Sequence, residues 1–412
     1  MKSFPLEPIE KTCTDDARAA VNFTRGVPAN ESFPIDEVID AAVAILKQHG
    51  AAIMQYGPAT GFAPLREWIA GWQGVRPDQV LTGNGSLELV EFLCRHLLRP
   101  GDTVFTESPT YDRSLTLLRR HQVDVVGIPL EPDGPDMAVL EAELARCVPK
   151  FFYLIPDFQN PAGATCSGEK RRRIVELAEL RGFTLIEDAP YRLLRYRGRE
   201  EPTLFQLAPH RVVHMSSFTK LIAPGMRMGF MLGEAGLMAK LAKVAEDTYI
   251  SPGYVAQGIT YEWCRRGLLS PQVAKLKALY APRLEACLSA IDVYLPDAQA
   301  TRPDGGFFVS LTLPEGARTT AVRTAAAKRN LNLSDGLVRR YFQDQLAGGR
   351  VVLSVTSLTV TFKQAPSGFP TFYTKEGAAG DPEGGAPILV IDLLPSGDLD
   401  GDTRRDDDDW VR

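Results

Sequence analysis

The chain has 412 residues, of which 44% are hydrophobic and 24% charged, and its net charge is −5. This length predicts one large domain with a smaller one, and the absence of a basic stripe argues against a nucleic-acid partner. The N-terminus lacks the apolar stretch of a signal peptide, and no uncharged apolar run approaches the ~20 residues of a membrane span, so we expect a cytoplasmic protein.

After an N-terminal arm, helical and strand-like segments alternate along the chain. Apolar spacing predicts a first helix over residues 36–49 that ends at Gly50. Further helices are expected over residues 63–72, 87–98, 114–121, 137–147 and 168–181. Strand-like runs cover residues 80–85, 102–108 and 123–130.

Three later apolar runs carry polar residues at their C-terminal ends: FFYLIPDFQNP (151–161), FTLIEDAPY (183–191) and RVVHMSSFTK (211–220). Runs this apolar are typical of strands covered on both faces, as in a mainly parallel sheet. Open α/β sheets bind ligands at the C-terminal ends of their strands. These polar ends are therefore candidates for a ligand site.

A long helical pattern over residues 271–295 connects this region to a turn and strand in DGGFFVSLTLP. We expect an N-terminal arm (1–35) that packs with the small domain, a large domain (36–285), a small α+β domain (286–365) and an atypical tail (366–412). The tail is rich in Gly, Pro and Asp and is expected to be partly disordered.

The segment SSFTKLIAPGMRMGF places Lys220 just beyond an apolar strand. A lone lysine there is usually a surface residue. Here Ser217 and Thr219 offer hydroxyl groups, and Arg227 follows after a Pro-Gly turn. Hydroxyls and a guanidinium form a receptor for a dianion such as a phosphate, and a lysine beside it can form a Schiff base with an aldehyde.

A second segment, TGNGSLELVEF, leads small residues directly into a helix. Gly85 and Ser86 would aim free main-chain N–H groups at an anion, although Gly-Ser before a helix is often only a cap.

Asn160 in DFQNPAG, and Asp188 with Tyr191 in EDAPY, complete the pattern. An aspartate at the end of an apolar strand needs a positive partner, and a protonated pyridine nitrogen is one. The asparagine and the tyrosine can bond a phenolic oxygen on the same ring. Taken singly, Asn-Pro is also a turn and Asp188 a helix cap.

The order and spacing of these segments resemble fold-type I pyridoxal-phosphate enzymes of the aspartate aminotransferase superfamily. Within it the chain is similar to the branch with 2-aminoadipate and kynurenine aminotransferases and the C-terminal domains of MocR-type regulators. The resemblance runs from Phe23 to Gly336 and includes FTRGVP, YGPATGFAPLREWIA, ESPTY, QNPAG, EDAPY, SSFTK and APGMRMGF. It implies an α/β fold with a mainly parallel seven-stranded sheet in the large domain, and pyridoxal 5′-phosphate as cofactor.

The resemblance also implies roles for particular residues. Lys220 would form the Schiff base and move the proton, and Asp188 would hold the pyridine nitrogen protonated. Asn160 and Tyr191 would bond the phenolic oxygen, and Tyr111 would stack on the ring. The phosphate would be bound by Gly85, Ser86, Ser217, Thr219 and Arg227. Tyr56 would reach into the neighbouring subunit's site, which implies a homodimer, and Gly26 lies in the arm that closes over the substrate.

Three positions depart from the family pattern. Leu87 replaces a common glutamine in the phosphate loop, so only its main chain can contact the phosphate. Arg25 replaces a small residue; pointing inward it would pair with a distal carboxylate of an acidic substrate, and pointing outward it is a surface residue. The arginine expected to bind the substrate's α-carboxylate is replaced by Val352 in GGRVVLSVTSLTV.

Arg350, two residues earlier, is the first candidate to take that role, with Arg339 and Arg340 as weaker candidates. Alternatively, the reading frame of this end of the chain has shifted and it does not encode the family's usual structure.

We therefore expect a ping-pong aminotransferase acting on an L-amino acid and a 2-oxo acid, either 2-aminoadipate- or glutamate-like or of broad range. A lyase or decarboxylase using the same cofactor is the alternative, followed by a catalytically impaired cofactor-binding protein. A MocR-type regulator would need a DNA-binding domain before the arm. The six cysteines show no metal-ligand spacing, and we expect no metal and no disulfide framework.

Overall fold

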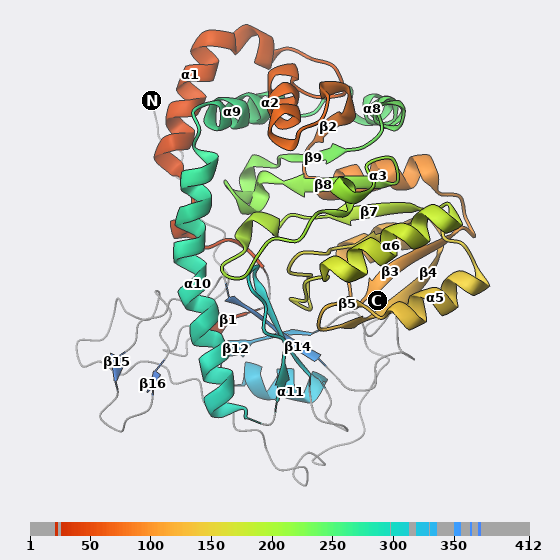
Figure 1. Ribbon diagram of the computed structural model, residues 1–412. Coiled ribbons are helices and arrows are strands. Elements are labelled where there is room, and N and C mark those ends of the chain that lie inside the picture. Colours follow the sequence, from red (N-terminus) through yellow and green to blue (C-terminus); the bar gives the residue numbers. More distant parts are fainter. Residues whose placement is uncertain are drawn as a thin grey trace, which may run out of the picture.

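The large part of the chain is built on an eight-stranded sheet with the order β2-β9-β8-β7-β6-β3-β4-β5 (Figure 1). The computed structural model describes residues 21–23, 26–296, 298–312, 319–328, 330–335, 350–355, 363–364 and 370–371. In sheet order the strands are β2 (Val80–Gly83), β9 (Gly229–Leu232), β8 (Val212–Ser217), β7 (Thr184–Asp188), β6 (Phe151–Leu154), β3 (Thr103–Ser108), β4 (Asp124–Glu131) and β5 (Gly134–Pro135).

The centre of this sheet is parallel, from β4 through β3, β6 and β7 to β8. Strand β9 runs antiparallel to both of its neighbours, and the two-residue β5 pairs antiparallel with β4 at the edge. The expected mainly parallel α/β sheet is confirmed. The expected seven strands become eight within the described residues because the turn after β4 folds back far enough for β5 to pair.

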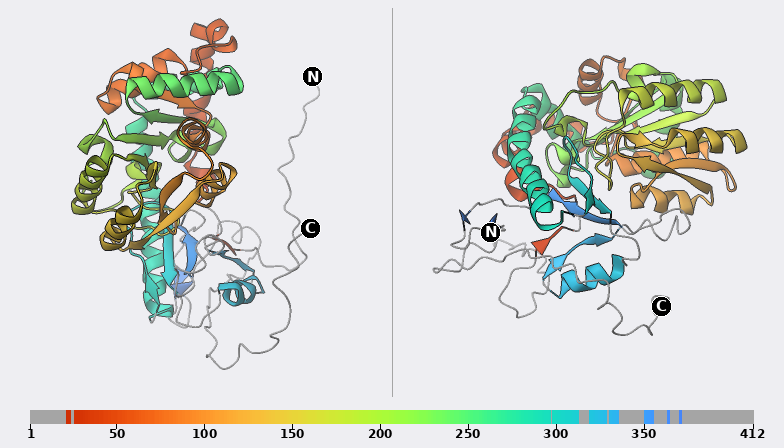
Figure 2. Two further views of the ribbon diagram at one scale, coloured as in Figure 1. Left: turned by 90° about the vertical axis from the view of Figure 1, so that its right-hand side faces the viewer. Right: turned by 60° about the horizontal axis from the view of Figure 1, so that its bottom comes forward.

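Helices lie on both faces of the sheet, as parallel connections require (Figures 1 and 2). They are α2 (Ala63–Gln73), α3 (Ser86–Leu97), α4 (Asp112–Arg120), α5 (Met137–Arg146), α6 (Gly168–Arg181), the short α7 (Leu204–Leu207), α8 (Ala235–Tyr249) and α9 (Tyr254–Arg265). Their ends follow local chemistry. The Ser167 side chain accepts a hydrogen bond from the Lys170 N–H at the start of α6, and Gly182 ends that helix with φ of 78°.

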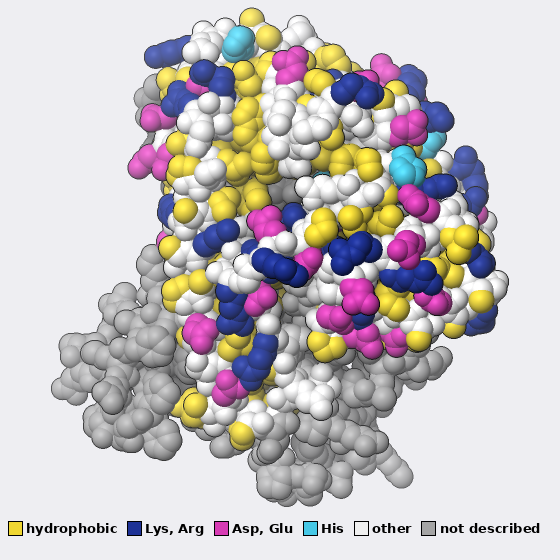
Figure 3. Space-filling view, viewed as in Figure 1, with side chains coloured by type: hydrophobic (Ala, Val, Ile, Leu, Met, Phe, Trp, Pro, Cys, Tyr) yellow, Lys and Arg dark blue, Asp and Glu magenta, His cyan; other side chains and the backbone are white. Residues whose placement is uncertain are grey.

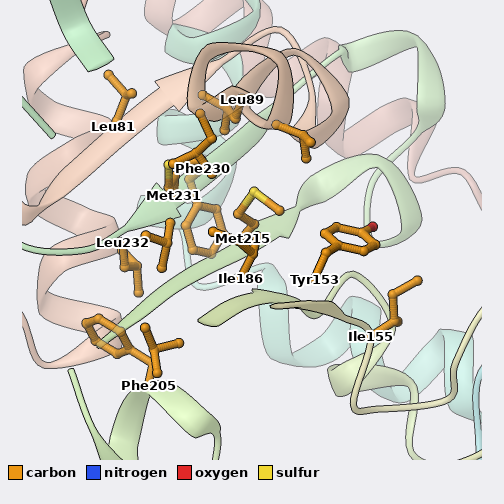
Figure 4. Packing of buried hydrophobic residues seen from close by; sticks show 14 of the residues in the cluster. Leu81, Leu89, Tyr153, Ile155, Ile186, Phe205, Met215, Phe230, Met231 and Leu232 are labelled. Carbon is orange, nitrogen blue, oxygen red and sulfur yellow. The ribbon is translucent and has the colours of Figure 1, made fainter. Parts of the chain in front are cut away.

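The sheet is covered by a continuous apolar core. Figure 4 shows side chains from β2, β6, β7, β8 and β9 packed against one another and against Leu89 of α3 and Phe205 of α7. Every residue of β2, β6 and β9 is buried, which explains why these segments are unbroken apolar runs in the sequence.

The first helix departs from expectation. It spans α1 (Ile35–Met54) and runs through Gly50, with a kink at His49 (φ −131°, ψ 18°), so the expected end at Gly50 is wrong. Ile53 beyond the kink is 2% exposed and joins the same core as Ala41 and Ile45. Burial of this last turn offsets the poor helix propensity of glycine, which acts here as a bend rather than a stop.

Helix α10 (Leu269–Tyr294) runs from the large sheet to a second, smaller sheet at the lower end of Figure 1. That sheet has the order β10-β11-β14-β13. Its strands are β10 (Gln299–Ala300), β11 (Phe308–Thr312), β14 (Arg350–Ser354) and β13 (Ser334–Asp335), and α11 (Thr319–Ala327) lies beside it. The expected boundary between residues 285 and 286 falls inside α10, which packs its first half on the large core and its second half on a separate small one.

The N-terminal arm joins the small core. Strand β1 (Val21–Asn22) pairs in parallel with β12 (Leu331–Asn332), and Phe23 is buried among α10 and the small sheet. One further hairpin pairs β15 (Lys363–Gln364) with β16 (Pro370–Thr371). The rest of the expected tail, together with Arg25, Arg339 and Arg340, lies outside the described residues.

Candidate active site

The predicted site residues converge at the C-terminal edge of the parallel strands. Asp188 ends β7, Lys220 ends the single turn η4 (Phe218–Lys220) after β8, and Tyr111 follows β3. Asn160 lies in the turn after β6. Because parallel strands all end at the same edge, segments more than a hundred residues apart meet there.

Lys220 lies in an enclosed, mostly aromatic setting. Its Nζ donates a hydrogen bond to the Gly26 carbonyl oxygen at 2.7 Å and lies 6.0 Å and 5.8 Å from the ring centroids of Tyr191 and Phe307. Burial, with a smaller contribution from the positive charge of Arg227, lowers the pKa of this amine to about 8. A large neutral fraction near neutral pH makes the amine a competent nucleophile for an aldehyde.

Asp188 is 6% exposed, and its two carboxylate oxygens differ. The Tyr153 hydroxyl donates to Oδ2 at 2.7 Å, whereas Oδ1 is buried with no hydrogen-bond partner among the described residues. Burial raises the pKa of this carboxyl to about 6. An unpartnered buried carboxylate oxygen is costly, so this site fits a ligand that brings a positively charged N–H donor, such as a protonated pyridine.

Tyr191 and Asn160 lie side by side. The Asn160 side chain hydrogen-bonds the Tyr191 phenol, whose pKa is raised mainly by burial and further by the nearby Tyr111 and Asp188. Tyr111 is half-buried, and burial also raises its pKa. Thus the structure brings together the residues predicted to surround a pyridine ring.

A cradle of main-chain and hydroxyl groups forms where β9 passes between β2 and β8. Gly229 is opposite Gly83 on one side and Ser217 on the other, so the two predicted phosphate segments are held against each other. Ser86 begins α3, and its helix leaves free N–H groups at that end.

Arg227 closes this cradle. Its Nη2 donates to the Asn84 carbonyl oxygen at 2.9 Å, and a Cβ on Gly85 would lie only 2.3 Å from Nη2. Ser217 Oγ accepts a hydrogen bond from the Thr219 N–H at 3.0 Å. Leu87 is the second residue of α3. Two hydroxyls, a guanidinium and a helix N-terminus suit a phosphate dianion.

Some predicted residues are not part of this group. Tyr56 is 73% exposed in the single chain, and Arg25 lies outside the described residues. Gly26 is in place, because a Cβ there would lie 2.4 Å from the Phe308 ring.

Arg350 is not brought to the site. It pairs with Thr312, whereas Ser354 is the residue opposite Phe308, and four residues of strand span about 13 Å. The register of β14 therefore separates Arg350 from the residues around Lys220, contrary to its expected role.

Three buried residues at this edge escaped prediction: Tyr153, Glu107 and Gln159. Tyr153 sits in an apolar run and reads as core, although a buried tyrosine hydroxyl usually needs a partner. Glu107 and Gln159 stand in the motifs ESPTY and QNPAG, and a buried carboxyl or amide also requires partners. That requirement was the signal that could have identified them.

The described residues hold no group of three or more His, Cys, Asp or Glu side chains suited to a metal ion. Within the same residues, no helix has the length and apolar character to cross a membrane.

Known proteins share this arrangement. The family model described as "Aspartate amino-transferase" matches residues 14–335. The 2-aminoadipate transaminase of Thermus thermophilus is 32% identical, over 77% of this chain and 81% of its own. Aromatic-amino-acid aminotransferase 1 of Thermococcus litoralis is also 32% identical, over 76% and 78%.

Among solved structures, the α-aminoadipate aminotransferase of Thermus thermophilus, complexed with N-(5′-phosphopyridoxyl)-L-leucine, superimposes with a TM-score of 0.78. It is 31% identical, and the match covers 82% of this chain and 87% of the other.

Proposed function

This chain belongs to the aspartate aminotransferase family and is a pyridoxal-phosphate-dependent aminotransferase, and we propose that Lys220 and Asp188 are the two residues on which its transfer reaction depends. When bound, the cofactor supplies an aldehyde that captures amino groups and a ring that accepts the electrons released as an α proton leaves. The observation that carries the proposal is the pairing of an enclosed Lys220 amine with a buried, unpartnered Asp188 oxygen.

Lys220 would hold the cofactor and later move the proton. Its pKa, lowered to about 8 by burial, leaves a useful fraction both neutral and protonated near neutral pH. The Gly26 carbonyl oxygen, 2.7 Å from Nζ, orients the amine toward the pocket.

Asp188 would accept a hydrogen bond from the ring nitrogen through Oδ1 and keep that nitrogen protonated. Asn160 and Tyr191 would bond the ring oxygen, and Tyr111 would stack on the ring. The phosphate would lie in the cradle closed by Arg227, bound by Gly85, Ser86, Ser217, Thr219 and the Leu87 main chain.

The experiment is amino-group exchange between an amino acid and a 2-oxo acid in the wild type and in Lys220→Ala. We expect transfer in the wild type and its loss in the variant, with the 2-oxo product released before the acceptor is consumed, as a ping-pong mechanism requires. Release of ammonia or carbon dioxide in place of transfer would instead identify a lyase or decarboxylase.

For the substrate, we propose a 2-aminoadipate- or glutamate-like amino acid or a broad range that includes it. The relatives named above act on 2-aminoadipate or on aromatic amino acids. An inward-pointing Arg25 would favour an acidic side chain. A substrate panel decides this point: if Arg25→Ala lowers kcat/KM equally for acidic and apolar donors, Arg25 has no role in selectivity.

We further propose a homodimer with shared active sites. Four exposed apolar residues recur at helical spacing along α1: Ile35, Ile39, Val43 and Leu46. The exposed Tyr56 follows the same helix. Figure 3 shows hydrophobic side chains gathered over the region of α1 and α9. An apolar stripe of this kind is unfavourable in water and suits an identical face in a second copy.

Two measurements test the dimer. Sedimentation should show a dimer that Val43→Asp weakens and Leu180→Asp, an equally drastic change at an exposed leucine of α6, does not. Co-expression of Tyr56→Phe with Lys220→Ala should yield mixed dimers with one intact site. Recovery of activity in these mixtures is the expected sign of shared sites, and none is expected if Tyr56 serves its own chain.

A cytoplasmic location accords with the thiols. All five cysteines in the described residues are free, which is typical of a reducing compartment. Fractionation of the cells that make the protein would test this location.

A further inference from the structure

Glu107 and Gln159 form a buried polar pair behind the site. Each is 1% exposed, Glu107 near the end of β3 and Gln159 in the turn after β6. Gln159 immediately precedes Asn160, and Glu107 lies four residues before Tyr111. Neither is among the residues proposed to touch the cofactor.

The Gln159 amide joins three segments. Its Nε2 donates to Glu107 Oε2 at 3.0 Å and to the Pro109 carbonyl oxygen at 2.7 Å, and its Oε1 accepts from the Ala162 N–H at 2.8 Å. Glu107 Oε2 also accepts from the Ile155 N–H at 3.0 Å. The amide thus uses both of its hydrogens and its oxygen in bonds that link β3, the loop toward Tyr111 and the turn that contains Asn160.

The turn itself is closed around Gln159. The Gln159 N–H donates to the Ala164 carbonyl oxygen at 2.8 Å, and the Gly163 N–H donates to the Gln159 carbonyl oxygen at 2.6 Å. Phe158, just before it, has φ of 54°, a conformation that a bulky residue rarely adopts. Such a conformation persists only where the surroundings determine it strongly.

Glu107 fits this role without needing a charge. Burial raises the pKa of its carboxyl to about 8, with the nearby negative charge of Asp188 adding to the effect. A neutral hydrogen-bonding side chain of the same shape should therefore replace it with little loss.

We propose that Glu107 and Gln159 are positioning residues for the cofactor, fixing the Tyr111 loop and the Asn160 turn relative to each other before the cofactor binds. This rests on the proposed roles of Tyr111 and Asn160. The two residues act through hydrogen bonds to the main chain of those segments. No contact with the reacting atoms is required of them.

The test compares four variants of the full chain. Gln159→Met and Glu107→Leu remove the bonds, and Glu107→Gln keeps an acceptor. Glu187→Gln is the matched control: Glu187 is also fully buried and accepts two main-chain N–H bonds, from Leu204 at 2.9 Å and Phe205 at 3.1 Å, but none from the two site segments. The readouts are pyridoxal-phosphate affinity, the absorbance and visible circular dichroism of the bound cofactor, and thermal unfolding of the cofactor-free protein.

We expect Gln159→Met and Glu107→Leu to bind the cofactor about tenfold to a hundredfold more weakly, because each loses at least two buried hydrogen bonds. Their circular dichroism should change, whereas Glu107→Gln should retain most of the affinity. The Glu187→Gln control should lose thermal stability while its affinity stays within about threefold. Equal affinity and spectra in Gln159→Met and the wild type would overturn the proposal.

A second measurement needs no variant and applies even if Gln159→Met fails to fold. Hydrogen exchange is followed at the Ala162 and Gly163 main-chain N–H groups of the wild type, with and without cofactor. Protection that survives cofactor removal is expected, and rapid exchange in the cofactor-free protein would refute a preformed turn. If the wild type does not bind pyridoxal phosphate at all, the proposed function fails; binding with an unprotected turn defeats only this inference.

Discussion

Removal of the Tyr153 hydroxyl gives the most direct test of how Asp188 is prepared for the cofactor. Tyr153 is fully buried on β6, and its ring packs in the large core beside β7 (Figure 4). The hydroxyl donates to Asp188 Oδ2 at 2.7 Å. Tyr153→Phe retains the ring and deletes only this bond.

The expected size follows from two quantities. A hydrogen bond to a charged acceptor contributes about 1.5–3 kcal/mol, which corresponds to about one to two pKa units for the carboxyl that receives it. Burial already raises the pKa of Asp188 to about 6. In the variant it should rise to about 7–8, so at pH 7 the ionised fraction falls from about nine-tenths to between about half and one-tenth.

The assay is a titration with pyridoxal phosphate between pH 6 and pH 9. At pH 7 we expect the variant to bind about twofold to tenfold more weakly than the wild type, in proportion to the loss of ionised Asp188. The deficit should shrink as pH rises toward 9, because both proteins then hold the carboxylate. Taking the ratio of the two proteins at each pH cancels the titration of Lys220 and of the cofactor.

Tyr249→Phe is the control, since the Tyr249 hydroxyl is buried without a hydrogen-bond partner among the described residues. It should leave the ratio near one throughout. If Tyr153→Phe also gives a ratio near one, or a deficit that does not vary with pH, Tyr153 does not act through the ionisation of Asp188.

Three further predictions concern Lys220 and the phosphate cradle. The rate of covalent capture of pyridoxal phosphate should rise with pH and level off above about 8, where the amine is neutral; stopped-flow absorbance measures it, and a flat profile would contradict the lowered pKa. Lys220→Arg keeps the charge but lacks an amine that captures an aldehyde, so denatured protein should carry no cofactor mass after borohydride reduction, unlike the wild type. Gly85→Ala, at φ of 108° with a Cβ that would meet Arg227, should weaken cofactor binding at least about tenfold, whereas Gly225→Ala, which meets no atom within 4 Å, should not; equal affinities in an equilibrium titration would remove Gly85 from the cradle.

The sequence alone was sufficient for the residues whose neighbours are close in the chain. Lys220, Ser217, Thr219 and Arg227 occupy one short segment, so their shared chemistry is visible without a fold. Asp188 was also recognisable, because a carboxylate that ends a buried strand needs a positive partner. The alternation of apolar runs and amphipathic helices likewise predicted the parallel α/β sheet.

Only the tertiary structure decided what depends on strand neighbours. Tyr153 meets Asp188 because β6 and β7 are adjacent, and Gln159 reaches Glu107 because β6 lies beside β3. Strand order and register arise from long-range packing, which no local pattern encodes.

The same reason explains the two expectations that differed. Gly50 does not end α1 because a buried Ile53 holds the helix beyond it. Arg350 looked able to replace the missing arginine two residues away, yet pairing with Thr312 places it at the wrong end of β14. Residue types and short spacings therefore determined the cofactor chemistry, whereas the pairing of distant strands decided which side chains support that chemistry and which lie too far away.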